Sequence, residues 1–173
     1  LETHAPAGYE VGMEGTHHGP TDVGAPSMFV EVGSDRPQWE DPEAARAVAK
    51  AILDLRGVDP LAPREDGTRR HLVGFGGGHY VPRFERIVRD TDWAVGHVAA
   101  DWGLEAMGDP ETRRELLGTA FDTSAADYAV IADERPDLRA VVESLGYRVV
   151  GETFVRETTG VALSLVERIE DAL

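Results

Sequence analysis

Short apolar runs alternate with helical segments along most of the chain, and this alternation constrains the fold more than any other feature. The runs have strand character, and we expect strands at 28–32, 72–75, 93–98, 128–131 and 147–150. Strands separated by helices form mostly parallel sheets. The sequence therefore predicts a three-layer α/β fold, with a mostly parallel or mixed sheet and helices on both faces.

Four helices are indicated by their ends and by their apolar spacing. Asp41 and Asp109 are each followed by proline, which is typical of an N-cap and a first helical position. A third helix is expected to end at Gly146, and a fourth is expected after Thr159. The segment 59–70 is rich in proline and charge, and we expect an exposed loop there.

The chain is strongly acidic and contains one lysine. It has 32 acidic and 17 basic residues, a net charge of −15, and only Lys50 is not an arginine among the basic residues. This composition predicts a protein of a salt-loaded cytoplasm, where ions screen the repulsion; a GC-rich genome is the alternative explanation. RNA binding normally needs a basic surface, but counterion release contributes little in concentrated salt. The charge therefore neither supports nor excludes an RNA partner.

The chain has no cysteine, which excludes a disulfide-linked partner and leaves His, Asp and Glu as possible metal ligands. No run reaches the roughly 18 apolar residues of a membrane helix, and no signal peptide is visible. We therefore expect a cytoplasmic monomer without a membrane partner. Residues 1–173 are expected to form a single domain, and Leu1 in place of methionine suggests a fragment.

Two adjacent histidines, His17 and His18, lie between glycines in the segment 14–21. Such a segment suits acid/base or metal chemistry better than packing. In an extended segment the two side chains point to opposite sides, so one of them is expected to face a site. The alternative is an exposed polar loop.

Three consecutive glycines, Gly76, Gly77 and Gly78, follow the expected strand 72–75 and end in His79. They allow a close backbone approach to a ligand and offer N–H groups to an anion. The spacing fits neither a P-loop nor a dinucleotide fingerprint. Tyr80 beside them could stack on a base or donate its hydroxyl. The alternative is a glycine-rich turn.

Several other polar residues are ambiguous. His97 lies in an apolar strand, where it is either a satisfied core residue or a ligand. Glu31 is costly in a buried strand unless it is paired, coordinates a metal or lies at an edge. Arg83 begins a basic stripe that is either functional or self-paired. His71 has no such context and is expected at the surface.

Four motifs, taken in order, resemble the metal-dependent D-aminoacyl-tRNA deacylases of archaea and plants. They are residues 14–21, 26–34 with Trp39, 76–83 and 94–97. The resemblance covers about residues 11–107, a little over half of the chain. It implies hydrolysis of the ester that joins a D-amino acid to the terminal ribose of tRNA, and a zinc cofactor. It also implies an architecture similar to peptidyl-tRNA hydrolases and phosphorylases, and a further N-terminal region that residues 1–173 lack.

The resemblance also assigns expected roles. The catalytic residues would be His17, His18 and His79. The substrate contacts would be Thr21, Gly76, Gly77, Gly78, Tyr80 and Arg83. The zinc ligands would be His18, His79, His97 and Glu31. Zinc would lower the pKa of a bound water to about 7, or one histidine would act as base without a metal.

Two alternatives remain from the sequence. One is a phosphorylase-like or nucleoside-binding enzyme of the same fold, which would need a buried arginine near Gly78; only Arg83 is placed for that role. The other is a non-catalytic tRNA-binding fragment.

Overall fold

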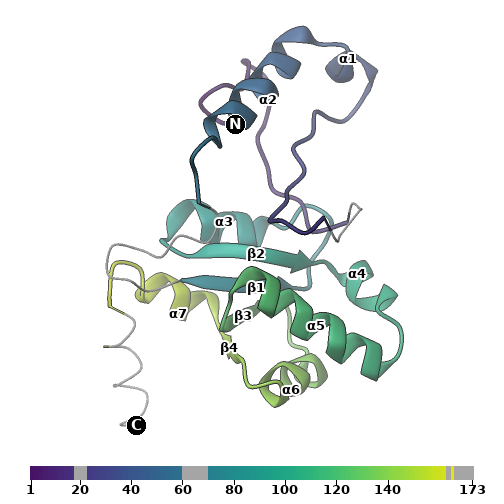
Figure 1. Cartoon of the computed structure of the whole chain (residues 1–173), viewed down its shortest axis with the longest axis vertical. Helices are drawn as coiled ribbons and strands as arrows, with labels where there is room; N and C mark the ends of the chain where they lie inside the picture. The colour runs from purple at the N-terminus through teal and green to yellow at the C-terminus, as the bar shows by residue number, and fades with distance from the viewer. Residues whose placement is uncertain (18–22, 60–69, 163–164, 166–173) are drawn as a thin grey trace. The chain divides into compact units, whose positions relative to one another are not determined.

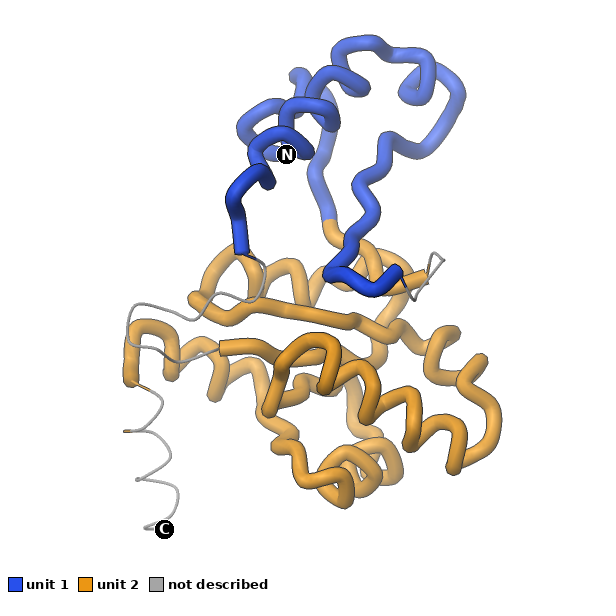
Figure 2. The backbone as a smooth tube through the Cα atoms, in the orientation of Figure 1, with its two compact units in different colours: residues 1–12, 18–60 blue, residues 13–17, 61–173 orange. Residues whose placement is uncertain are grey.

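The computed structural model describes residues 1–17, 23–59, 70–162 and 165, which divide into two compact units (Figure 2). Unit 1 comprises residues 1–12 and 18–60, and unit 2 comprises 13–17 and 61–173. A compact unit is not by itself an independently folding domain, so the expected single domain stays a prediction. Among the described residues, no helix is both long and apolar enough to cross a membrane.

The described part of unit 1 contains two helices, α1 (Arg36–Trp39) and α2 (Pro42–Asp54). The Asp41 carboxylate accepts a hydrogen bond from the N–H of Glu43 at 2.8 Å, which confirms the predicted N-cap of α2. The Tyr9 hydroxyl donates to the same carboxylate at 2.8 Å. The bond from Tyr9, together with that from Glu43, holds the pKa of Asp41 below its ordinary value.

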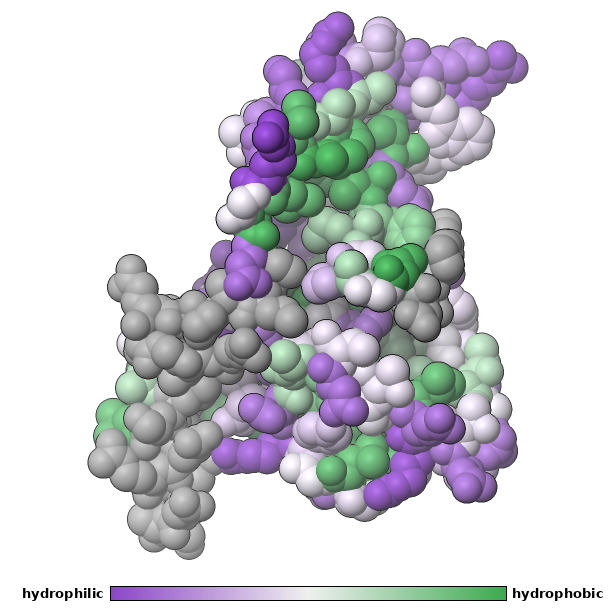
Figure 3. Space-filling model, in the orientation of Figure 1, coloured by the Kyte–Doolittle hydropathy of each residue, from purple (hydrophilic) through white to green (hydrophobic). Residues whose placement is uncertain are grey.

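The expected strand at 28–32 is wrong, because these residues form no strand. A strand needs a neighbour for its backbone hydrogen bonds, and no strand ladder lies within the described part of unit 1. Met28 and Phe29 are exposed, as is Trp39 in α1. Figure 3 shows apolar surface gathered over this unit.

Unit 2 is built on four parallel strands in the order β2-β1-β3-β4. They are β1 (His71–Phe75), β2 (Ala94–Ala99), β3 (Tyr128–Ile131) and β4 (Arg148–Val150). β1 pairs in parallel with both β2 and β3, and all five of its residues are buried. The alternating sequence pattern thus predicted these four strands and their parallel sheet.

Helices cover both faces of this sheet (Figure 1). Their bounds are α3 (Pro82–Asp90), α4 (Asp101–Ala106), α5 (Pro110–Ser124), α6 (Pro136–Ser144) and α7 (Glu152–Glu157). Leu72 of β1 packs in a cluster with residues of α3 and α7. Val73 and Phe75 point to the opposite face and pack in a cluster with α4, α5 and α6.

Asp109 caps α5 by accepting from the N–H groups of Glu111 and Thr112, as its Asp-Pro sequence predicted. Gly146 follows the end of α6 with a φ of +92°, the left-handed conformation expected of a helix-terminating glycine. The expected fourth helix after Thr159 lies mostly outside the described residues.

His71 is buried, so its expected surface position is wrong. It opens the central strand, and its Nδ1 lies 3.0 Å from the carbonyl oxygen of Ser124. Most of the expected loop at 59–70 lies outside the described residues. Arg70 at its end is buried rather than exposed, and it donates to the carbonyl of Thr158 at 2.6 Å.

Replacing Gly74 in β1 tests how closely α3 packs on the sheet. A β-carbon there would lie 2.6 Å from Cε1 of Phe84, whose ring is buried and cannot move away. We expect Gly74→Ala to lower the free energy of unfolding by about 1–3 kcal/mol in denaturant titrations. Gly118→Ala in α5 is the matched control, because its β-carbon would meet nothing closer than 4.0 Å. The control should gain about 0.5–1 kcal/mol; equal effects of both changes would contradict this packing.

Candidate functional site

The carboxyl ends of the parallel strands place several polar residues at one edge of the sheet. β1 leads into Gly76, β2 into Asp101 and β3 toward Arg135. In sheets of this type, ligands bind beyond the carboxyl ends, where the strand order reverses. The reversal occurs at β1, because β2 lies on one side of it and β3 on the other.

The glycine segment forms a fixed turn at this edge. Gly76 and Gly77 have φ values of +90° and +89°, which other residues rarely adopt. The N–H of Gly76 donates to the carbonyl of Ala99 at 2.8 Å, and that of Gly77 to Oδ1 of Asp101 at 3.1 Å. The N–H of Gly78 has no partner among the described residues. The N–H groups of Gly76, Gly77 and Gly78 were all expected to hold an anion. Gly76 and Gly77 use theirs within the fold, so among the described residues only the N–H of Gly78 is left for this role.

The segment 13–17 lies against the same edge. Glu14 and Tyr80 form an antiparallel bridge. The N–H of Gly15 donates to the carbonyl of His79 at 3.0 Å, and that of Thr16 to Val98 at 2.7 Å. These backbone bonds bring the side chains of segment 13–17 next to the end of the glycine turn.

A carboxylate and two imidazoles converge there. Oε2 of Glu14 lies 3.5 Å from Nε2 of His17, and Oε1 lies 3.4 Å from Nε2 of His79. The two imidazole rings are 4.6 Å apart between centroids. One ligand atom from each of the three residues lies within 4.8 Å of the others, which is close enough for a shared metal ion.

The tautomer of His17 follows from its other nitrogen. Nδ1 lies 2.6 Å from the carbonyl oxygen of Gly15, which can only accept, so Nδ1 carries a proton. The neutral ring then points the lone pair of Nε2 toward the Glu14 carboxylate. A cation between these two electron-rich groups would stabilise the arrangement, as would protonation of the imidazole. The donor set therefore fits a bound metal ion.

Two exposed aromatic residues flank this cluster. Trp102, in the first turn of α4, lies edge-on to His17 with 6.2 Å between ring centroids. Tyr80 lies edge-on to His79 at 4.9 Å. Their exposed fractions are 45% and 64%. The sequence reasoning missed Trp102, although a tryptophan in the first turn after the end of β2 would have been the signal.

The cluster overlaps only in part with the expected metal ligands. It contains His79 and adds Glu14 and His17, with Glu14 three residues before His17 in the same motif. Nε2 of His97 instead lies 3.1 Å from Oγ1 of Thr123. Glu31 belongs to unit 1.

His18 and Thr21 lie outside the described residues. Nε of Arg83 lies 3.9 Å from a carboxylate oxygen of Glu152, so this side chain is exposed and ion-paired. It does not supply the buried arginine near Gly78 that the phosphorylase-like alternative would need.

Comparison with known proteins gives one consistent family. The family model described as D-aminoacyl-tRNA deacylase matches residues 1–150. D-aminoacyl-tRNA deacylases from Haloarcula marismortui and Natronomonas pharaonis are 65% and 56% identical over 100% and 99% of this chain. The chain spans only 39% and 37% of the length of these two relatives.

More distant relatives agree. The D-aminoacyl-tRNA deacylase of Methanosarcina barkeri is 36% identical over 88% of this chain and 47% of its own length. A crystal structure described as a conserved protein of unknown function, AF0625, has a TM-score of 0.70 and 31% identity. That match covers 87% of this chain and 51% of the solved one.

The environment of His97 predicts a pH dependence of stability. Desolvation lowers the pKa of His97 below its ordinary value of 6.5. On acidification the unfolded chain therefore takes up this proton first. The neutral His97 side chain therefore contributes fully to the free energy of unfolding above about pH 6.5. This contribution is lost as the pH falls from 6.5 through the lowered pKa of His97 in the folded chain. We expect the loss of unfolding free energy between pH 7.5 and pH 5 to be smaller in His97→Gln than in the parent chain. Equal losses in urea titrations would contradict this.

Proposed function

Because the chain belongs to the D-aminoacyl-tRNA deacylase family, we propose that it hydrolyses the ester between a D-amino acid and the terminal ribose of tRNA. The products would be the free D-amino acid and free tRNA. The observation that carries the proposal is the convergence of Glu14, His17 and His79 at the carboxyl edge of a parallel sheet. Such a substrate would place the protein in the cytoplasm, and a monomer is sufficient because one chain supplies all three residues.

We further propose zinc as the metal. Nε2 of His17, Nε2 of His79 and one Glu14 oxygen would hold it, which is the two-histidine, one-carboxylate set of many hydrolytic zinc sites. The bond from His17 Nδ1 to the Gly15 carbonyl supports this, because it is the usual outer contact of a metal-bound imidazole. Bound zinc would supply a water of lowered pKa and polarise the ester carbonyl.

The chain's own residues would then handle the proton and the charge. The second Glu14 oxygen would accept the proton of the attacking water and return it to the leaving ribose oxygen. The N–H of Gly78 would donate to the developing oxyanion. The backbone bonds of Gly76 and Gly77 support this role, since they fix the turn that carries this N–H.

The aromatic pair would bind the end of the tRNA. The terminal adenine is attached to the ribose that carries the ester, so it must lie close to the hydrolytic residues. Trp102 and Tyr80 offer exposed ring surface beside His17 and His79 of the cluster. Stacking of one base on an aromatic side chain contributes about 1–3 kcal/mol.

The architecture is proposed to share the arrangement of peptidyl-tRNA hydrolases and phosphorylases. The four-stranded parallel sheet with its site at the carboxyl edge supports this likeness.

Replacing the clustered histidines tests the function directly. We expect His17→Ala and His79→Ala to lower kcat on a D-aminoacyl-tRNA by about 10²–10⁴-fold and to lower the zinc content measured by elemental analysis. His97→Ala is the matched control, because His97 bonds Thr123 outside the cluster; it should keep its zinc.

The assay should be run in molar KCl with added zinc, and with the L-aminoacyl-tRNA as a substrate control. An N-terminally extended version of the chain is assayed in parallel. If neither chain hydrolyses the D-ester, the proposed function is wrong. If His97→Ala alone loses zinc, the ligand set offered here is wrong.

Trp102 provides a separate test of tRNA-end binding. We expect Trp102→Ala to raise KM for D-aminoacyl-tRNA about 5- to 100-fold, because one stacked base is lost, while kcat changes little. Trp102→Phe keeps a ring and should recover most of the affinity. A fall in kcat at constant KM would instead indicate that Trp102 positions His17, and would overturn the stacking role.

A further inference from the structure

Most arginines in the described part of the chain are already neutralised by carboxylates. The pairs are Arg36 with Glu40, Arg46 with Glu43, Arg70 with Asp92, Arg83 and Arg86 with Glu152, Arg89 with Glu85, Arg135 with Asp101, Arg139 with Glu143, and Arg156 with Asp90 and Glu152. A chain of net charge −15 therefore has few cations left for an anionic ligand.

Arg113 on α5 differs from these arginines. It forms no ion pair with any residue that the structure describes, and its Nε is buried without a hydrogen-bond partner. A buried N–H of a charged group costs free energy when it stays unpaired. What sets Arg113 apart is that no described carboxylate neutralises it, so its guanidinium is able to bind an anion in the pocket that it lines.

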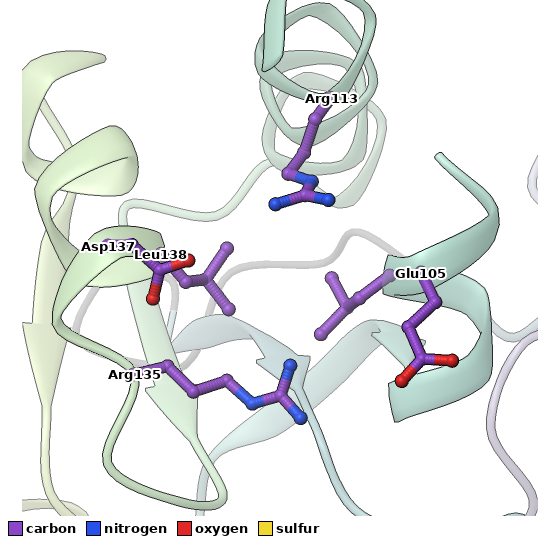
Figure 4. Close-up of a pocket in the computed structure, with 6 residues that line it drawn as sticks. Glu105, Arg113, Arg135, Asp137 and Leu138 are labelled. Atoms are coloured by element: carbon purple, nitrogen blue, oxygen red, sulfur yellow. The ribbon is translucent and has the colours of Figure 1, made fainter. Parts of the chain in front are cut away.

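The guanidinium of Arg113 points into a small pocket between α4, α5 and α6 (Figure 4). The lining residues are Leu104, Glu105, Arg113, Arg135, Asp137 and Leu138. Its volume is about 50 Å³, several times the 10–15 Å³ that one water needs. Arg135 projects toward the same space from the side opposite α5 (Figure 4), and Nη2 of Arg135 lies 2.6 Å from Oδ1 of Asp101.

The start of α6 adds a second source of positive potential. Asp137 and Leu138 belong to its first turn, and no side chain caps this helix. Pro136, the first residue of this nine-residue helix, has no N–H, so the N–H groups of Asp137 and Leu138 are the ones left at the pocket, together with the positive end of the helix dipole. Glu105 and Asp137 also line the pocket, but both residues are exposed to solvent.

From these observations we propose that the pocket of Arg113 and Arg135 binds a phosphate group, and that this group is a backbone phosphate of the tRNA. The second part rests on the proposed function. The Arg113 guanidinium has no carboxylate partner among the described residues, and Arg135 on the opposite wall keeps the N–H donors that its ion pair with Asp101 does not use. Guanidinium N–H donors match the geometry of a phosphate. Asp101 joins this pocket to the site, because its Oδ1 accepts from both Arg135 and the N–H of Gly77.

The proposal can be tested by measuring how tightly the full chain binds tRNA that carries no amino acid. Binding is followed by fluorescence anisotropy at several KCl concentrations. We expect Arg113→Met to raise Kd about tenfold and to reduce the slope of log K against log salt by about 1, the value for one lost phosphate contact. Arg113→Lys should give an intermediate Kd, because the charge stays but the paired donors are lost. Arg46→Met is the control, since Arg46 is already paired with Glu43 on α2.

The opposite change sharpens the test. Asp137→Asn removes a carboxylate from the mouth of the pocket and should tighten tRNA binding about threefold at low salt. Melting temperatures of all variants show whether each is folded. An unchanged Kd in a folded Arg113→Met variant, or weaker binding in Asp137→Asn, would overturn the proposal.

Inorganic phosphate separates the two possible sources of the anion. Line broadening of its ³¹P signal by the parent chain, lost in Arg113→Met, is expected from a phosphate pocket whatever its natural ligand. If the parent chain broadens the ³¹P signal but binds no tRNA, the pocket is a site for free phosphate and the tRNA assignment is overturned. If Arg113→Met leaves both the Kd for tRNA and the deacylation of D-aminoacyl-tRNA unchanged, the proposed function stands and this inference fails.

Discussion

The site depends on the backbone pairing of segment 13–17 with the end of the glycine turn. Gly15 lies where a β-carbon would be 3.3 Å from both the Ala100 β-carbon and the Val98 carbonyl, so the segment approaches the sheet as closely as a chain can. Its hydrogen bonds to His79 and Val98 fix both its position and its direction. Glu14 then faces His79 across more than sixty residues of sequence. Without this pairing, the edge of the sheet would carry a single histidine.

The sheet supplies the rigidity that such a pairing requires. β1 is central, buried along its whole length and bonded in parallel to a strand on each side. Its end is therefore among the least mobile points of unit 2, and the glycine turn begins there. Asp101 at the end of β2 extends this order by accepting bonds from Gly77 and from Arg135. One carboxylate thus connects three strand ends, because Arg135 follows β3.

Sequence reasoning succeeded where the signal is local. The Asp-Pro pairs predicted the starts of α2 and α5, because capping needs only neighbours in the chain. It failed at 28–32 and at His71, because a strand partner and a position in the centre of a sheet are set by distant residues. Glu14 was missed as a ligand for the same reason: its partner His79 becomes a neighbour only after folding. Trp102 had a local signal, since it lies in the first turn after the end of β2.

An acidic surface is compatible with an RNA substrate, because salt screens the repulsion between exposed charges more strongly than it screens contacts in water-poor positions. Concentrated salt screens exposed charges within a few ångströms, so surface ion pairs such as Arg36 with Glu40 contribute little to steering RNA. Groups in water-poor positions are screened much less. A protein with this composition would recognise an RNA at short range, and the proposed contacts are stacking on Trp102 and N–H groups that are partly withdrawn from solvent. The buried Nε of Arg113 is such a group. An arginine on an open face would be neutralised by the many neighbouring carboxylates or by salt, whereas one in a pocket keeps its attraction for a phosphate that fits.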